Sequence, residues 1–311
     1  MKVLVTGGTG FLGRAVVRAL AGGGHEPVVF ARAATASGIA AALVDGDVRD
    51  RRAIDHAARG CDAICHMAAL VSIWRRRPQD FDDVNVGGLR NVLDAASALG
   101  IPRVLYTSSF LALPPVGRSS PLEANDYQRT KVAADRLADR RVGDGSPLIR
   151  VYPGVVYGPG SLTEGNLVGR LLHDHLNGRL PGLIGPEHQW SYSYVDDVAA
   201  GHRAALENGD IGARDILGGE NATQTHMFTI VGRLTGTRVP RRVPYPIANA
   251  IGAVEEWRVR AFGGLPLVTR GAVEIFRWSW ALDSGVAIRE LRYAMTPLAE
   301  GLERTLAAAR A

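Results

Sequence analysis

Tyr127 and Lys131 are the side chains of this 311-residue sequence whose types and spacing best suit proton chemistry. They form Tyr-x-x-x-Lys at the start of a helix that we expect over residues 126–142. Residues at this spacing share a helical face, so the phenol and the ammonium point the same way. A neighbouring ammonium favours the phenolate and lowers the pKa of the phenol from about 10. Such a tyrosine can exchange a proton with a carbonyl or alcohol oxygen while a hydride moves.

A hydroxyl group is expected beside this pair, at the end of a strand predicted over residues 102–107. Ser108 and Ser109 follow that strand directly, and either could donate a hydrogen bond to the reacting oxygen. Of the 36 basic residues only Lys2 and Lys131 are lysines. Arginine cannot be deprotonated in proteins, so the lysine at position 131 indicates a role in proton transfer.

Three glycines predict a phosphate site near the amino terminus. Gly7, Gly10 and Gly13 lie between a strand expected over residues 2–6 and a helix expected over residues 11–22. Gly7 allows a tight turn, Gly10 lets the backbone approach a diphosphate, and Gly13 lets the helix pack on the strand. Free N–H groups and the positive end of the helix dipole then face the phosphates. This arrangement predicts a dinucleotide-binding site.

The residues after the second expected strand, 27–31, bear on the choice of dinucleotide. An NAD site usually has an acidic residue about 20 residues after the glycines. This chain has Ala31-Arg32 there instead. A guanidinium matches a 2′-phosphate in charge and donor geometry, so NADP(H) is predicted, with NAD(H) as the alternative. Arg32 could equally be an exposed arginine on a variable loop.

Apolar segments alternate with helical ones through the first half of the chain. The segments read as strands are apolar throughout, which is typical of a parallel sheet covered on both faces. The sequence therefore predicts a doubly wound α/β fold with a smaller, mostly helical C-terminal substrate lobe. Residues 1–155 would form the nucleotide-binding part, with 191–210 returning to it, and residues 156–190 and 211–311 the lobe. Strands are expected at 2–6, 27–31, 41–44, 62–66, 102–107 and 147–152, and helices at 11–22, 50–59, 78–99, 126–142, 195–206, 222–234, 246–262, 268–278 and 296–309.

The order of these motifs resembles a known family. Thr6 followed by Gly-x-x-Gly-x-x-Gly, a serine after the fifth strand and Tyr-x-x-x-Lys resemble the extended short-chain dehydrogenase/reductases, the NAD-dependent epimerase/dehydratase family. The similarity spans about residues 1–305 and is greatest to dihydroflavonol 4-reductase-like and hopanoid-associated epimerase-like proteins. It implies a Rossmann fold.

The resemblance also implies roles for individual residues. Tyr127 would be the acid, Lys131 would tune it and bind ribose hydroxyls, and Ser109 would orient the substrate oxygen, with Ser108 as the alternative. His66, at the end of a strand, is expected to be structural. Cofactor contacts are expected from Gly7, Thr9, Gly10, Phe11, Leu12, Gly13, Arg32, Asp47, Val48, Ala68, Ala69, Asn85, Thr107, Tyr127, Lys131, Tyr152, Pro153, Val155 and Val156. Substrate contacts are expected from Leu70, Trp74, Leu111, Leu167, Trp190 and Tyr192.

Position 190 separates two substrate groups within the family. Nucleotide-sugar epimerases and dehydratases place an arginine for the diphosphate where Trp190 stands here, and an indole cannot neutralise that charge. Together with Arg32 this favours an NADP(H)-dependent reductase of a ketone on a bulky hydrophobic or ring substrate, similar to dihydroflavonol reductases and hydroxysteroid dehydrogenases. An NAD-dependent nucleotide-sugar epimerase or dehydratase is the first alternative. A non-catalytic NADP-sensing protein is the second, although such relatives typically lose the tyrosine or the lysine.

Composition narrows the remaining classes. Hydrophobic residues make up 46% and charged residues 22%, which argues against disorder. The net charge of +5 is spread among interleaved acids and bases, so we expect no nucleic-acid partner and attribute the excess to an anionic cofactor. No apolar run reaches the roughly 18 residues of a membrane span, and the start lacks a signal peptide, so a cytoplasmic protein without a membrane partner is expected. Cys61 and Cys65 are expected to be free thiols, and no metal site is expected.

A homodimer is expected from the helices at 78–99 and 126–142, which in the family often pair across a two-fold axis. The apolar stripe of the first helix would suit that contact, but it would equally suit the chain's own sheet. Its members are Leu89, Val92, Leu93 and Ala96.

Overall fold

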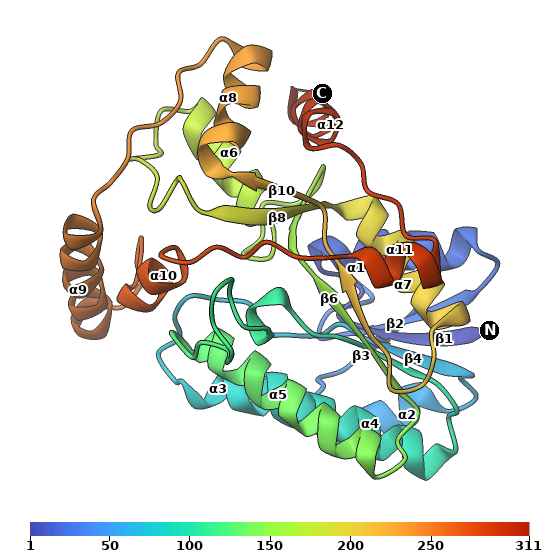
Figure 1. Ribbon diagram of the computed structural model, residues 1–311. Coiled ribbons are helices and arrows are strands. Elements are labelled where there is room, and N and C mark those ends of the chain that lie inside the picture. Colours follow the sequence, from blue (N-terminus) through green and yellow to red (C-terminus); the bar gives the residue numbers. More distant parts are fainter. Residues whose placement is uncertain (311) are drawn as a thin grey trace.

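The computed structural model describes residues 1–310, and its larger sheet contains seven parallel strands (Figure 1). Their order reverses between β1 and β4, as in other doubly wound sheets. The predicted parallel α/β fold is therefore confirmed. In spatial order the strands are β3 (Ala42–Asp45), β2 (Glu26–Ala31), β1 (Lys2–Thr6), β4 (Ala63–His66), β5 (Val104–Thr107), β6 (Leu148–Pro153) and β9 (Arg214–Leu217).

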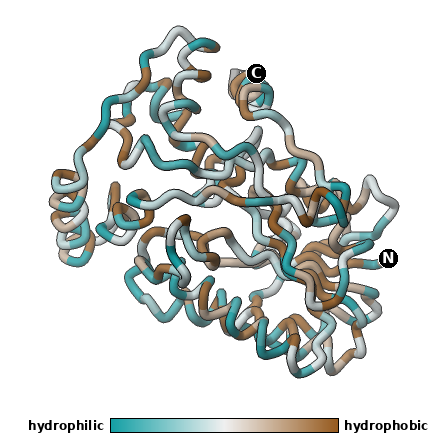
Figure 2. The backbone as a smooth tube through the Cα atoms, in the orientation of Figure 1, coloured by the Kyte–Doolittle hydropathy of each residue, from teal (hydrophilic) through white to brown (hydrophobic). Residues whose placement is uncertain are grey.

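Helices cover both faces of this sheet, which explains why its strands are apolar throughout (Figures 1 and 2). In β1, Val3 and Val5 join one buried cluster and Leu4 joins the other. The first face is covered by α1 (Phe11–Gly22), α7 (Val195–Asn208) and α11 (Gly285–Leu291). The second is covered by α2 (Arg51–Ala58), α4 (Gly88–Leu99) and α5 (Asp126–Gly143).

The helix expected over residues 78–99 is continuous but not uniform. It begins as α3 (Gln79–Phe81), widens into the π-helical segment η1 (Asp82–Gly87), and continues as α4. Such π-helical insertions are rare and occur frequently at functional sites. A 3-10 turn, η2 (Phe110–Ala112), follows β5.

The smaller lobe is built around a second sheet that the sequence analysis did not identify. Its three strands, in spatial order, are β10 (Glu220–Thr223), β8 (Gln189–Tyr194) and β7 (Val155–Tyr157). A third core cluster lies between this sheet and the lobe's helices. The helices that contribute to this cluster are α6 (Leu167–Leu176), α8 (Gln224–Thr235), α10 (Arg270–Ile275) and α12 (Leu298–Arg310). Helix α9 (Tyr245–Phe262) also belongs to the lobe but contributes no residue to the cluster and packs on α10.

The expected lobe helices were found at α8, α9, α10 and α12, but α6, α11 and the four short strands β7–β10 were not expected. Part of the range 211–311 also belongs to the large sheet, because β9 is its seventh strand and α11 packs against β9 and α7. Through its parallel pairing with β6, strand β9 brings a segment from the second half of the chain into the large sheet.

The apolar stripe of α4 packs on the chain's own sheet. Leu89, Val92, Leu93 and Ala96 are all at most 2% exposed within the second core cluster. The stripe therefore gives no support to a dimer, and the homodimer and the cytoplasmic location stay predictions. None of the helices in residues 1–310 combines the length and hydrophobicity that a membrane span requires.

Helix α6 begins at a buried asparagine. Asn166 is 0% exposed, and its side-chain oxygen accepts a hydrogen bond of 3.0 Å from the backbone N–H of Gly169. Its amide also lies within 3.5 Å of the carbonyl oxygens of Gly158 and Ser161. One side chain thus joins the loop after β7 to the first turn of the helix.

Replacing Asn166 with alanine should lower the free energy of unfolding by about 1–2 kcal/mol, since a buried N–H loses its acceptor. Asn177→Ala is the matched control, because Asn177 lies exposed at the other end of the same helix and bonds only to His173. Chemical denaturation measures both. Equal losses in the two variants would contradict this role of Asn166.

Candidate active site

The carboxyl ends of β1, β4 and β5 meet where the strand order reverses. In doubly wound sheets this point is where ligands bind. The glycine turn follows β1, Ala68 and Ala69 follow β4, and Ser108 and Ser109 follow β5. The structure thus brings three separate predicted motifs to one edge.

The glycine turn is closely packed. Gly7 has a φ of +73°, and a Cβ there would lie 2.7 Å from the backbone nitrogen of Ala68. A Cβ on Gly13 would overlap the carbonyl oxygen of Gly7. Gly10 is the N-cap of α1 and makes no side-chain hydrogen bond, so the first N–H groups of the helix lack partners within it. This cradle fits a diphosphate, and the predicted residues Thr9, Phe11 and Leu12 lie in it.

Thr6 and His66 form hydrogen bonds at the ends of β1 and β4, next to the glycine turn. Thr6 Oγ1 lies 2.7 Å from His66 Nδ1 and accepts hydrogen bonds from the backbone nitrogens of Met67 (3.2 Å) and Ala68 (3.3 Å). Burial, with the nearby Lys131, lowers the pKa of His66 to about 3. His66 is therefore neutral. Its Nδ1 contacts Thr6, while within residues 1–310 its buried Nε2 has no hydrogen-bond partner, so the structural role of His66 stays a prediction.

Arg32 is exposed just after β2. Ala31, the last residue of that strand, lies in register with Asp45 of β3. The Asp45 carboxylate accepts hydrogen bonds from the backbone nitrogen (2.9 Å) and hydroxyl (2.6 Å) of Thr35, which lower its pKa. Asp45 thus holds the loop that carries Arg32. It lies on the strand next to β2, at whose end an NAD site usually has its acidic residue.

Asp47 is held by an arginine that the sequence analysis did not single out. Arg49 donates from Nε (3.0 Å), Nη2 (2.7 Å) and its backbone nitrogen (2.9 Å) to this carboxylate. The hydrogen bond from Arg49 and the positive charge of Arg32 contribute to lowering the pKa of Asp47. Val48 is buried, where a Cβ on Gly88 would meet its side chain.

Helix α5 presents Tyr127 and Lys131 to the end of β5. The Tyr127 side chain lies beside that of Ser109, which acts to lower the pKa of the phenol. Lys131 is 3% exposed, and its Nζ donates a 3.0 Å hydrogen bond to the carbonyl oxygen of Thr107. The same ammonium lies 5.3 Å from the ring centroid of Tyr106. The side chains of Tyr127, Ser109 and Lys131 therefore all lie at the carboxyl end of β5.

The expected pKa of Tyr127 was wrong for this structure. Burial raises it to about 12, and the side chain of Ser109 opposes that rise only in part. Burial also lowers the pKa of Lys131 to about 8, against the opposing charge of Asp135. The phenol stays protonated at neutral pH because burial disfavours the charged phenolate.

The two candidate serines face different partners. Ser108 Oγ donates to Asp135 at 3.3 Å, and the Tyr152 hydroxyl donates to the same carboxylate at 2.6 Å. Arg214 completes the group at 3.1 Å. Ser109 is the serine beside Tyr127. The side chain of Tyr152 is fully buried in this group, so its expected cofactor contact is left to the backbone of the strand end.

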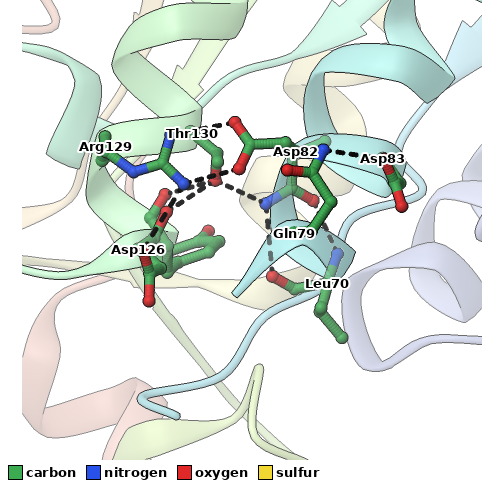
Figure 3. A network of polar contacts seen from close by, with 9 residues as sticks. Leu70, Gln79, Asp82, Asp83, Asp126, Arg129 and Thr130 are labelled. Carbon is green, nitrogen blue, oxygen red and sulfur yellow. Dashed lines mark hydrogen bonds and ion pairs between the residues drawn. The ribbon is translucent and has the colours of Figure 1, made fainter. Parts of the chain in front are cut away.

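Asn85 lies in η1 and joins the segment after β4 to α5. Figure 3 shows the polar network between these elements, in which Arg129 of α5 faces Asp82 of η1. Asn85 accepts a 2.7 Å hydrogen bond from the backbone nitrogen of Leu70 and donates one of 2.9 Å to Thr130 Oγ1. Arg129 of α5 makes a paired contact with Asp82 of η1, at 2.9 and 2.6 Å. Asn85 is 2% exposed, so it positions the segment around Leu70 rather than presenting a free amide to a cofactor.

A small apolar pocket lies between α6 and the lobe sheet. It contains three of the expected substrate residues, Leu167, Trp190 and Tyr192, together with the expected cofactor residue Val155. Phe276, not foreseen from the sequence, stacks against Trp190 with ring centroids 5.0 Å apart. The other members are Val168, Leu171 and Gln224.

The remaining predicted residues lie outside that pocket. Leu70 and Trp74 are half-buried after β4, and Leu111 is buried in the lobe core. Pro153 ends β6 and Val156 lies in β7, while Thr107 ends β5.

A polar contact that the sequence analysis missed joins the segment after β4 to the loop after β7. Glu164 accepts from Ser72 Oγ at 3.1 Å and from Arg75 Nη2 at 3.3 Å. This contact connects one wall of the site to the loop that precedes α6. Within residues 1–310 no cluster of histidine, cysteine or acidic side chains could hold a metal ion.

Comparisons with known proteins agree with this geometry. Residues 3–217 match the NAD dependent epimerase/dehydratase family. Sterol demethylase protein B of Methylococcus capsulatus is 33% identical over 276 residues, which cover 84% of this chain and 83% of the relative. A 2-alkyl-3-oxoalkanoate reductase of Stenotrophomonas maltophilia is 30% identical over 334 residues, covering 100% of both chains. The crystal structure of gox2253 superposes with a TM-score of 0.83 at 30% identity, covering 99% of this chain and 97% of that one.

Gly13→Ala should weaken the binding of NADPH and NADH about tenfold or more, because the new Cβ overlaps the Gly7 carbonyl and opens the phosphate cradle. Gly22→Ala is the control, since Gly22 ends the same helix with no atom within 4 Å of a Cβ there. Fluorescence titration measures both. Undiminished binding by Gly13→Ala would contradict the location of the phosphate site.

Proposed function

Because the chain belongs to the NAD-dependent epimerase/dehydratase family and is an NAD(P)-dependent oxidoreductase of the extended short-chain type, we propose that it reduces a ketone on a bulky hydrophobic substrate with NADPH. The placement of Tyr127 beside Ser109, with Lys131 buried on the same helix and bonded to the end of β5, carries this proposal. These groups meet at the carboxyl edge of β5, near the glycine cradle.

The apolar side chains around Trp190 support a hydrophobic substrate, which would have to displace some of them because the cavity that they enclose measures only about 10 Å³. Trp190 is 4% exposed and is enclosed by Phe110 and Phe276, at centroid distances of 5.9 and 5.0 Å. No arginine lines the pocket within the described chain, so the diphosphate of a nucleotide sugar would lack a counter-charge there. The named relatives support the same class, since one is a sterol demethylase protein and another a reductase of 2-alkyl-3-oxoalkanoates.

Arg32 supports the use of NADPH. Its guanidinium is exposed after β2, while the nearest strand-end carboxylate, Asp45, is engaged by Thr35. A 2′-phosphate would find a free donor fork at this position, whereas a ribose 2′-hydroxyl would find no free acid.

The reaction follows from the protonation states of the site. The nicotinamide, when bound, supplies the hydride. Tyr127, protonated because its pKa is about 12, donates its proton to the carbonyl oxygen as negative charge develops there. Ser109 donates a hydrogen bond to the same oxygen, and Lys131 stabilises the phenolate that remains. In the reverse direction the phenolate accepts the proton of the alcohol.

Tyr127→Phe should lower kcat about 10²–10⁴-fold and leave NADPH binding unchanged, because only the transferable proton is lost. The wild-type rate of reduction should fall as the pH rises through about 8, where Lys131 loses the proton with which it stabilises the phenolate. Stopped-flow oxidation of NADPH with a panel of ring and alkyl ketones measures both.

Tyr194→Phe is the control for that substitution, because its ring packs against Tyr157 in the lobe. A Tyr127→Phe enzyme with full turnover would refute the proton-transfer role. Purified protein that carries tightly bound NAD and binds a uridine diphosphate sugar would instead identify an epimerase or dehydratase.

Arg32→Ala should weaken NADPH binding about tenfold or more while NADH binding stays the same, since only the 2′-phosphate contact is removed. Arg18→Ala serves as the control, because Arg18 is an exposed arginine of α1 paired with Asp196. Isothermal titration with both cofactors decides the matter. Tighter wild-type binding of NADH than of NADPH would overturn the assignment.

A further inference from the structure

Helix α9 and the loop after it carry a group of exposed apolar side chains, which we call the α9 surface. The five most exposed large apolar residues of the described chain all belong to it, with exposed fractions from 57% to 78%. Single exposed apolar residues are normal, but a contiguous group usually marks an interaction site. The members of the α9 surface are Ile247, Ile251, Val254, Trp257, Phe262, Leu265 and Leu267.

The α9 surface is held together by contacts within the chain. Trp257 and Phe262 meet edge to face, with ring centroids 5.8 Å apart. The loop folds back onto the helix, because Leu267 donates its backbone N–H to Glu255 at 2.7 Å and Leu265 accepts from Arg258 at 2.9 Å. These residues therefore form one patch rather than scattered side chains.

The opposite face of α9 is the one that packs on the protein. Ala248, Gly252 and Val259 are buried there, and Glu256 binds Arg270 of α10 through bonds of 2.8, 3.1 and 2.9 Å. In Figure 1, α10 lies between α9 and the body of the molecule, so α9 lies at the periphery of the protein. The apolar patch consequently faces away from the fold that it belongs to.

The segment of sequence that contains this patch is rich in arginine. Residues 233–270 contain seven arginines and only two acidic residues, Glu255 and Glu256. Their net charge of +5 equals that of the whole chain, so the rest of the sequence is formally neutral. Both glutamates are already paired, with Arg258 and Arg270 respectively. Helix α9 and its loop are neutral in themselves, with two arginines and two glutamates over residues 245–267, and the positive charge comes from the arginines on either side of them. Four of these, Arg233, Arg238, Arg241 and Arg242, precede the helix, and Arg242 is paired with Glu187.

We propose that the α9 surface binds the headgroup region of an anionic phospholipid membrane. Exposed tryptophan, phenylalanine and leucine flanked by arginine is the pattern of helices that lie in a membrane interface. A second copy of the chain would bring the same positive charge to the contact, which would oppose pairing through this face. The proposal concerns lipid binding alone and holds whatever reaction the site performs.

Co-sedimentation with vesicles tests the proposal on the full-length protein. Vesicles of phosphatidylcholine mixed with phosphatidylglycerol should bind the protein about tenfold or more tightly than vesicles of phosphatidylcholine alone. Added salt should weaken that binding, because it screens the arginines. No binding, or equal binding to neutral and anionic vesicles, overturns the proposal without any variant.

A matched pair of variants locates the binding surface. Ile247→Ser with Val254→Ser should reduce binding to anionic vesicles about tenfold, since exposed apolar area is lost from the interface. Ile211→Ser with Val116→Ser is the control, because these residues are comparably exposed, at 49% and 55%, and lie outside the α9 surface. Equal losses in the two pairs overturn the proposal. Concentration-dependent dimerisation that only the α9 pair abolishes, without vesicle binding, also overturns it and assigns the surface to a second copy.

Discussion

The register of helix α5 against the end of strand β5 is the constraint on which the site depends. Lys131 reaches the carbonyl oxygen of Thr107, and one turn later Asp135 accepts from Ser108. Both helix residues are at least nine-tenths buried, so a shift of either contact would cost a buried polar group its hydrogen bond. This double attachment fixes the first turn of α5, and it brings the Tyr127 hydroxyl to the serine that follows. A shift of one helical position would separate the phenol from that serine.

The sequence predicted the first half of the fold, in which strands and helices alternate regularly. The six strands of the first half were found because each is an apolar run of typical strand length, and the four helices because apolar residues recur along one side of each. The lobe sheet was missed although β8 carries a strand pattern, since Trp190, Tyr192 and Tyr194 alternate with Ser191 and Ser193. All five are buried, so the serines do not mark a solvent face. When neither face of a short strand is exposed to solvent, its sequence does not distinguish it from a loop. The strand can be recognised only once the neighbouring strands are known.

The candidate site shows where sequence reasoning reaches its limit. The motif supplied Tyr127 and Lys131, but not the protonation state of either, because burial depends on atoms from distant elements. Asn85 was expected near a cofactor, yet its amide is used by Leu70 and Thr130, which lie on other segments. The widened helical turn that holds it had no signal in the sequence. These hydrogen-bond partners lie far apart in the sequence, so only the folded structure identifies them.

The distribution of arginine modifies the first explanation of the chain's charge. An anionic cofactor was expected to account for the excess, but at the edge where the dinucleotide family binds its cofactor, Arg49 is neutralised by Asp47. Arg32 is the exposed cation there, and the rest of the attraction comes from backbone N–H groups in the glycine turn. Because residues 233–270 alone carry the formal excess, the positive charge belongs to the lobe. Cofactor affinity and surface charge are thus separate properties of this chain, carried by different elements.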